Sequence, residues 1–445
     1  MTKNLTIGEP RKILPRFALP LLISAMFQQL YNVFDSLIAG RGIGPDALAA
    51  VGASYPITML FIAFAIGGSM GTSIVVSQLF GAQKNDQVHT SIQTALISVV
   101  ILSLLLTAVG LALSRTALEL LRTPSNIMGD SLTYFNIYIL GLIFLFIYNV
   151  VTGIFQALGN SQTPLFLLIG SSVGNIILDI IFVVSFQWGV AGVAWATFIA
   201  QGASCILAFF LLMRHLKHLP GKEKSRHFSM IMLKKICTIA FPSICQQSFV
   251  SVGNLLVQAV INSYGSSVIA GYNVGLKINM FVVTCSSSFS NGLGSYTAQN
   301  LGAGKPERID EGYRVILRSL YSFMIPITIL IFASSRFIIT LFIGNSDPVA
   351  VQTGIEFLKI CSPFYLIIII KFVADNVLKG AGAMVPFMIT TFSDLILRVA
   401  ASYLFSYLFG STGIWAAWPV GWVIGTIIAA VFYCKKSWLK FMHVS

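Results

Sequence analysis

Twelve long apolar segments divide this chain of 445 residues, and they limit its fold more than any other feature. A helix needs about 20 mostly apolar residues to cross the hydrocarbon core of a bilayer, and each segment is long enough. Only 10% of the residues are charged, too few to cover a water-facing surface. A membrane β-barrel would instead show alternating segments of about ten residues. The sequence therefore predicts an all-α polytopic membrane protein with twelve transmembrane helices. The segments lie at about residues 17–39, 47–70, 90–113, 130–155, 164–186, 189–213, 234–262, 268–298, 313–334, 353–378, 386–408 and 413–434.

The basic residues between these segments predict the orientation of the chain. The loops on one side, with both termini and the central segment 214–235, contain 20 Lys and Arg, whereas the other side has four. Cytoplasmic loops carry the excess of Lys and Arg, so both termini are predicted to be cytoplasmic in a protein of the cell membrane. The net charge of +13 lies in these loops and not on a basic, aromatic face that would bind nucleic acid.

The two halves of the chain echo each other at an offset of 221 to 223 residues. The loop motif from Gln78 to Lys84 recurs from Gln299 to Lys305. Three further short motifs recur in the same order. We expect two pseudo-symmetric six-helix bundles, 1–213 and 236–445, joined by a cytoplasmic linker, 214–235. Parallel repeats of this kind place a substrate path between the halves, near the bilayer midplane.

Three small-residue motifs on the apolar segments predict close helix packing. They are Gly67-x-x-x-Gly71, Gly170-x-x-x-Gly174 and Gly421-x-x-x-Gly425. We assign them no chemistry.

Several ionisable residues lie within the spans, where a charge costs about 2.5–3.5 kcal/mol. Lys371 and Asp375 are four residues apart, as are Asp394 and Arg398, so each pair can share a helix face and neutralise itself. Lys277 follows a glycine-rich break and can extend to the interface.

Asp35 and Asp179 differ from these paired acids, because the residues that share their helix faces are polar but not basic. These neighbours are Gln28, Tyr31 and Asn32 on the first span and Asn175 on the fifth. Such an all-oxygen set can hold a small hard cation, or the two acids can share a proton. Alternatively, each acid is a protonated, hydrogen-bonded structural residue.

With two six-span halves, the repeated loop motif and these acids, the sequence resembles the multidrug and toxic compound extrusion (MATE) family along essentially its whole length. The resemblance implies a cation-coupling site for Na⁺ or H⁺ in the first half, and the same residues would be the metal ligands for Na⁺. A second branch of the family carries a Glu on helix 7, where this chain has Gln246, Gln247 and Ser248. The implied coupling residues are Asp35, Asn175, Asp179 and Thr197. The implied substrate-cavity residues are Gln28, Tyr31, Tyr134 and Asn149, to which we add Asn32 of the same stripe, and the implied hinge is Pro20.

The resemblance further implies a secondary active antiporter and not an enzyme, exporting amphiphilic or cationic drugs by alternating access. We expect small-molecule substrates, the lipid bilayer and no other cofactor or nucleic acid as partners, and a monomer. Two alternatives remain. A flippase for a lipid-linked saccharide would be expected to show several basic residues in its central cleft, and the first half has none in mid-span. A membrane-embedded enzyme would need a catalytic constellation, but the five His lie outside the spans.

Overall fold

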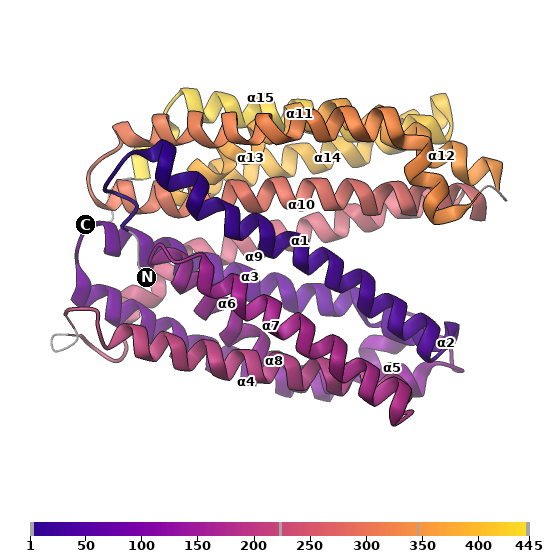
Figure 1. The fold of residues 1–445 in the computed structure, drawn as a ribbon, viewed down its shortest axis with the longest axis horizontal. Helices are drawn as coiled ribbons and strands as arrows, with labels where there is room; N and C mark the ends of the chain where they lie inside the picture. The colour runs from indigo at the N-terminus through magenta and orange to yellow at the C-terminus, as the bar shows by residue number, and fades with distance from the viewer. Residues whose placement is uncertain (1–3, 222–224, 345–346, 442–445) are drawn as a thin grey trace. The chain divides into compact units, whose positions relative to one another are not determined.

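The computed structural model describes residues 4–221, 225–344 and 347–441, apart from the side chains of 33–37, 39–42, 45, 48 and 441. Within these residues the regular secondary structure is entirely helical (Figure 1). In the part described, eleven helices are long and apolar enough to cross a membrane, and two shorter helices that meet at 45° form a twelfth span. The prediction of an all-α polytopic membrane protein with twelve spans is confirmed.

The first half of the chain contains eight α-helices and one π-helical turn. They are α1 (Pro10–Gly42), α2 (Pro45–Ala53), α3 (Tyr55–Gly81), α4 (Asn85–Leu120), α5 (Met128–Leu140), α6 (Leu142–Ala157), α7 (Gln162–Asp179), the π-helical turn η1 (Ile180–Ser185) and α8 (Gly189–Leu216). The bent span is α5 with α6, and Gly141 lies at the bend.

The second half repeats this plan with seven α-helices and two short 3-10 turns. They are α9 (Met230–Asn262), α10 (Ser266–Gly302), α11 (Glu307–Ile343), α12 (Pro348–Cys361), η3 (Ser362–Phe364), α13 (Tyr365–Gly380), α14 (Met384–Phe409), α15 (Ser411–Cys434) and η4 (Ser437–Phe441). Pro363 lies in the turn between α12 and α13, where it interrupts the helical hydrogen-bond ladder. Gly410, with a φ of 66°, supplies the left-handed residue between α14 and α15.

The helices cluster into two compact units, and the division falls inside two helices. The N-terminal unit consists mainly of Ile23–Ile244, and the C-terminal unit consists of Leu5–Leu22 with Cys245–Ser445. The first turns of α1 therefore pack in the C-terminal unit, and the first half of α9 packs in the N-terminal unit. Within the C-terminal unit, α10 contacts α11, α12 and α13, and α14 lies along α15 (Figure 1).

Glycines permit these helix contacts. A Cβ at Gly71 of α3 would lie 2.6 Å from the carbonyl oxygen of Ile236 and 2.8 Å from the Cβ of Ala240, both on α9. In the C-terminal unit, a Cβ at Gly292 of α10 would lie 3.0 Å from the Cβ of Ala18 on α1. The first turns of α1 and the first half of α9 thus pack at close helix crossings that only small residues allow.

Two of the three predicted small-residue motifs lie at such crossings. Gly67 and Gly71 face α9, and the motif on α15 faces α13 and α14. Among the described residues the prediction is wrong for the motif on α7, because a Cβ at Gly170 or Gly174 would meet none of them on another helix within 4 Å. Spacing alone does not reveal whether a helix partner covers that face.

Many apolar side chains point away from the helix contacts. On α4, Ile101 is 59% exposed and Leu105 is 58% exposed, and on α11 Leu341 is 71% exposed. A soluble protein rarely exposes so much contiguous apolar surface, whereas lipid tails solvate it. The fold therefore fits a bilayer.

Candidate functional site

A buried polar group lies on the α7 and α8 helix pair of the N-terminal unit. Asn175 and Asp179 are one turn apart on α7, and their exposed fractions are 3% and 0%. Helix α7 packs against α8, and Nδ2 of Asn175 donates a hydrogen bond of 3.4 Å to Oγ1 of Thr197. Three of the four predicted coupling residues therefore belong to one pair of packed helices.

Asp179 is the last residue of α7, and the chain continues from it as the π-helical turn η1. Such turns are rare and occur frequently at functional sites. Gly192 of α8 lets the turn approach closely, because a Cβ there would lie 3.2 Å from the backbone carbonyl carbon of Phe182. The ring of Phe182 stacks on Trp188 with a centroid distance of 4.8 Å. The wide turn that follows the acid is thus packed against the start of α8.

A narrow cavity of about 10 Å³ adjoins this group, and Thr197, Tyr134 and Gln201 are among its lining residues. This volume is about that of one water-sized sphere. Tyr134 also stacks on Tyr138, with 6.4 Å between the ring centroids. In the described part of the chain, Oδ1 of Asn175 is buried and accepts no hydrogen bond. A polar ligand of small size fits both observations.

The donor set of this group is chemically uniform. Asp179 offers a carboxylate, Asn175 a carboxamide oxygen and Thr197 a hydroxyl oxygen. Hard cations prefer such oxygen ligands, and a carboxylate can equally accept a proton. The residues present therefore fit a small hard cation or a proton, and they contain no soft sulfur or imidazole ligand.

The side chain of Asp35 lies outside the described residues. Its helix, α1, reaches the site region through Ile38, which packs against the buried pair Val183 and Val193. Tyr134 packs against the same pair. The first, fourth, fifth and sixth spans thus meet beside the turn that follows Asp179.

The other predicted cavity residues have more varied surroundings. Gln28 and Asn32 of α1 are exposed, and Tyr31 is half-buried. Asn149 of α6 is half-buried, and its Nδ2 donates to the carbonyl oxygen of Leu145 in its own helix at 2.8 Å.

Pro20, the predicted hinge, is buried inside α1. It belongs to the stretch of α1 that packs in the C-terminal unit, which ends at Leu22.

A second group of buried charges lies in the C-terminal unit. The Nζ of Lys371 is 2.8 Å from Oδ2 of Asp375 on the same helix and 3.9 Å from Oδ2 of Asp394 on α14. The predicted pairing of Lys371 with Asp375 is confirmed. The predicted pairing of Asp394 with Arg398 is wrong, because Arg398 instead lies over the ring of Trp418, 4.3 Å from its centroid.

The repeated loop motif has a role that sequence analysis did not predict, because it binds the segment before the first helix. Oε1 of Gln299 accepts a hydrogen bond of 2.9 Å from the backbone N–H of Leu5, and Nζ of Lys305 donates to the carbonyl oxygen of Thr6 at 3.2 Å. Nη2 of Arg308 donates to the carbonyl oxygen of Gly8 at 2.8 Å.

In the first half, residues outside the repeated motif bind the segment before α9. The hydroxyl oxygens of Thr90 and Thr94 on α4 accept hydrogen bonds of 3.0 and 3.1 Å from the backbone N–H groups of Arg226 and Ser229. Both units thus bind the segment that precedes a helix through side chains far along the chain.

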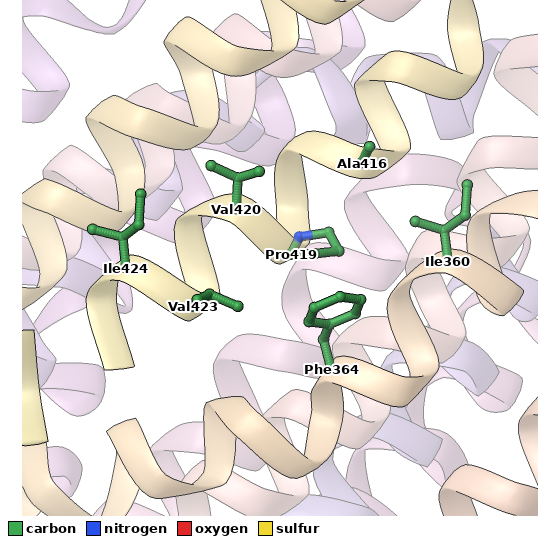
Figure 2. A pocket seen from close by; sticks show the side chains of 7 residues that line it. All are labelled: Ile360, Phe364, Ala416, Pro419, Val420, Val423 and Ile424. Atoms are coloured by element: carbon green, nitrogen blue, oxygen red, sulfur yellow. The ribbon is translucent and has the colours of Figure 1, made fainter. Parts of the chain in front are cut away.

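A larger cavity of about 430 Å³ lies between α12, η3 and α15, and Figure 2 shows the side chains that line it. All seven are apolar: Ile360, Phe364, Ala416, Pro419, Val420, Val423 and Ile424. This cavity offers no side-chain ligand for an ion, so it does not compete with the α7 and α8 group as a cation site.

Comparison with known proteins accounts for both the fold and the internal repeat. The model of the MatE family matches residues 20–181 and again residues 242–404. The probable multidrug resistance protein YpnP of Bacillus subtilis (strain 168) is 28% identical over 98% of this chain and 97% of its own length. The multidrug export protein MepA of Staphylococcus haemolyticus is 24% identical over 91% of this chain and 88% of its own length.

Solved structures show the same fold. A crystal structure of MATE in complex with MaL6 superposes with a TM-score of 0.91 at 22% identity, covering 99% of each chain. An outward-facing multidrug resistance MATE family transporter of the MOP superfamily gives 0.90 at 21% identity, again over 99% of each chain. The family match covers most of both halves, and its two segments begin and end at the offsets seen in the sequence. The chain therefore belongs to the MatE family, the multidrug and toxic compound extrusion transporters.

Proposed function

We propose that this transporter is a secondary active antiporter that exports amphiphilic, often cationic, compounds in exchange for Na⁺ or H⁺. It works as a multi-pass protein of the cell membrane with both termini in the cytoplasm, and as a monomer. The coupling residues are Asp35, Asn175, Asp179 and Thr197.

One observation carries the proposal: a fully buried acid next to a buried carboxamide and a hydroxyl, inside an apolar bundle. Asp179 is 0% exposed, and Asn175 and Thr197 are hydrogen bonded to each other beside it. An acid at this depth is costly and is retained where it has a function. A small cation or a proton that neutralises it supplies the coupling energy for export, and the small cavity at Thr197 provides space for the ion.

Neutralisation of the acids is the step that couples ion uptake to drug release. When the cation binds, the charge of the carboxylates is compensated, and α1 can move at Pro20. Proline favours this position as a hinge, because it has no N–H to donate to the carbonyl oxygen of Arg16 one turn earlier. Movement of α1 shifts Gln28, Tyr31 and Asn32, and with them the substrate contacts. The halves then alternate, and the cation leaves to the cytoplasm.

Ethidium transport in everted membrane vesicles tests the proposal, with Na⁺ and proton gradients imposed separately. We expect Asp179→Asn and Asp35→Asn to abolish transport driven by the coupling gradient, because neither amide can bind a proton or balance the charge of a cation. The matched control is Asp130→Asn, which removes an exposed acid near the start of α5 in the same unit. Gradient-driven transport that survives in both Asp179→Asn and Asp35→Asn would remove the proposed site.

A further inference from the structure

The ammonium group of Lys371 occupies a position that resembles a cation site. It lies 2.8 Å from a carboxylate oxygen of Asp375 and 3.9 Å from one of Asp394. The hydroxyl of Thr390 donates a hydrogen bond of 2.7 Å to the other oxygen of Asp375. The side chains of Lys371 and Asp375 are each 5% exposed, and that of Asp394 is 13% exposed. Two acids from two helices thus lie around one positive charge, and a hydroxyl group binds one of these acids.

Among the described residues, Lys371 is the cation that pairs with both acids of this group. Arg398, the second cation nearby, lies over Trp418 and does not pair with either acid. In the described part of the chain, Oδ1 of Asp394 is buried without a hydrogen-bond donor. Since an uncompensated charge is expensive in a buried site, the two carboxylates depend on the ammonium group.

The neighbouring helix is shaped around this group. A Cβ at Gly421 of α15 would lie 2.5 Å from Oδ1 of Asp394, and one at Gly425 would lie 2.9 Å from Cε of Lys371. The close approach of α15 excludes other groups from this side of the acids. The motif Gly421-x-x-x-Gly425 therefore makes room for the charged group as well as for the helix crossing.

The internal repeat relates residues of this group to the candidate coupling site of the first half. Both Asn175 with Thr197 and Arg398 with Trp418 join the fifth and sixth spans of their half. Positions that are polar and neutral in the first half thus carry fixed cations in the second. Offsets of 222, 223 and 221 residues pair Asn149 with Lys371, Asn175 with Arg398, and Thr197 with Trp418.

We propose that Asp375, Asp394 and Thr390 form a site for a monovalent cation in the C-terminal unit, and that Lys371 fills it permanently with its own ammonium group. The second half consequently binds no exchangeable ion. Removal of the ammonium group opens the site to Na⁺ or to a small primary ammonium ion. The inference concerns the C-terminal unit alone and does not depend on the coupling role of Asp179.

The test is the thermal unfolding of purified protein, with Asp179→Asn as the background so that the N-terminal site cannot contribute. Lys371→Ala in this background should unfold at a lower temperature than the background in choline chloride. Addition of 100 mM Na⁺ or propylammonium at constant ionic strength should then raise its Tm by roughly 1–3 °C. The background itself should not respond, because its site is already filled.

Three controls make the result specific. Propanol, which lacks the charge of propylammonium, should not raise the Tm. Lys277→Ala in the same background removes an exposed lysine from another span of this unit and should show no cation response. Lys371→Ala combined with Asp375→Asn should lose the response, because one carboxylate ligand is gone.

Two results would overturn the proposal. The first is that neither cation raises the Tm of Lys371→Ala. The second is that Lys371→Ala is as stable as its background. If Lys371→Ala does not purify in a folded form, the titration is made on Lys371→Ser, which keeps both carboxylates and Thr390. Absence of a cation response there counts equally against the site.

Discussion

The crossing of α3 and α9 allows a sharp test of the packing, because its closest contact is with backbone. A Cβ at Gly71 would lie 2.6 Å from the carbonyl oxygen of Ile236, whereas an ordinary contact begins at 3.4 Å. The carbonyl oxygen cannot rotate away as a side chain can, so Gly71→Ala must separate the helices. Overpacking of this kind costs about 1–3 kcal/mol. The same change removes a helix glycine, a gain of up to about 1 kcal/mol.

We therefore expect Gly71→Ala to lower the free energy of unfolding by up to about 2 kcal/mol, the packing cost less the gain in helix propensity. The matched control is Gly170→Ala on α7, where a Cβ would meet no described residue of another helix within 4 Å. It should be neutral or slightly stabilising. Reversible unfolding in mixed micelles of increasing SDS content measures both values. Equal free energies for the two variants would refute the packing argument.

Three further predictions concern local contacts. Thr197→Val removes the hydroxyl that accepts a hydrogen bond from Asn175. The protein should stay folded, and the concentration of coupling cation needed for half-maximal transport should rise severalfold. An unchanged cation dependence would contradict the role of Thr197 as a ligand. Gln299→Ala leaves the buried N–H of Leu5 without its acceptor, a loss of about 1–3 kcal/mol, so the amide of Leu5 should exchange hydrogen faster, whereas Gln299→Glu should retain protection. Hydrogen bonds from Ser267 and from the first turn of α12 hold the pKa of Asp347 below its usual value of 3.8. Asp347 therefore contributes to stability above pH 3.8, and this contribution is lost as the pH falls through the lowered pKa. Above pH 3.8, amides at the start of α12 should exchange faster in Asp347→Ala than in wild type. Below the lowered pKa, the two proteins should exchange equally.

The sequence predicted the spans and the repeat because both depend on features that are local or periodic. Apolar segments of sufficient length located all twelve spans, including the bent span at Gly141. The bend itself was not predicted, since Gly in an apolar helix does not indicate how its neighbours pack. Which residues join each unit depends on contacts such as that between Gly71 and Ala240, which hydropathy does not contain.

Side-chain pairing across helices was the main feature that the sequence could not supply. Spacing of four residues correctly paired Lys371 with Asp375, because both lie on one helix. The same rule failed for Asp394, whose cation comes from the neighbouring helix, and for Arg398, which lies over an aromatic ring. In the first half, the spacing placed Asn175 and Asp179 on one face, but only the structure shows the hydrogen bond of Asn175 to Thr197.

The exchange of helix segments between the two units has a consequence for how the protein is made. Leu5 is synthesised well before its hydrogen-bond partner Gln299, which lies 294 residues further along the chain. Until Gln299 has been synthesised, the first turns of α1 lie in the bilayer without their final neighbours. The N-terminal unit, in contrast, can pack once Ala240 has entered the membrane. We therefore expect the segment before α1 to bind late in the assembly of the C-terminal unit, and substitutions at Gln299 to leave that segment unbound after the N-terminal unit has assembled.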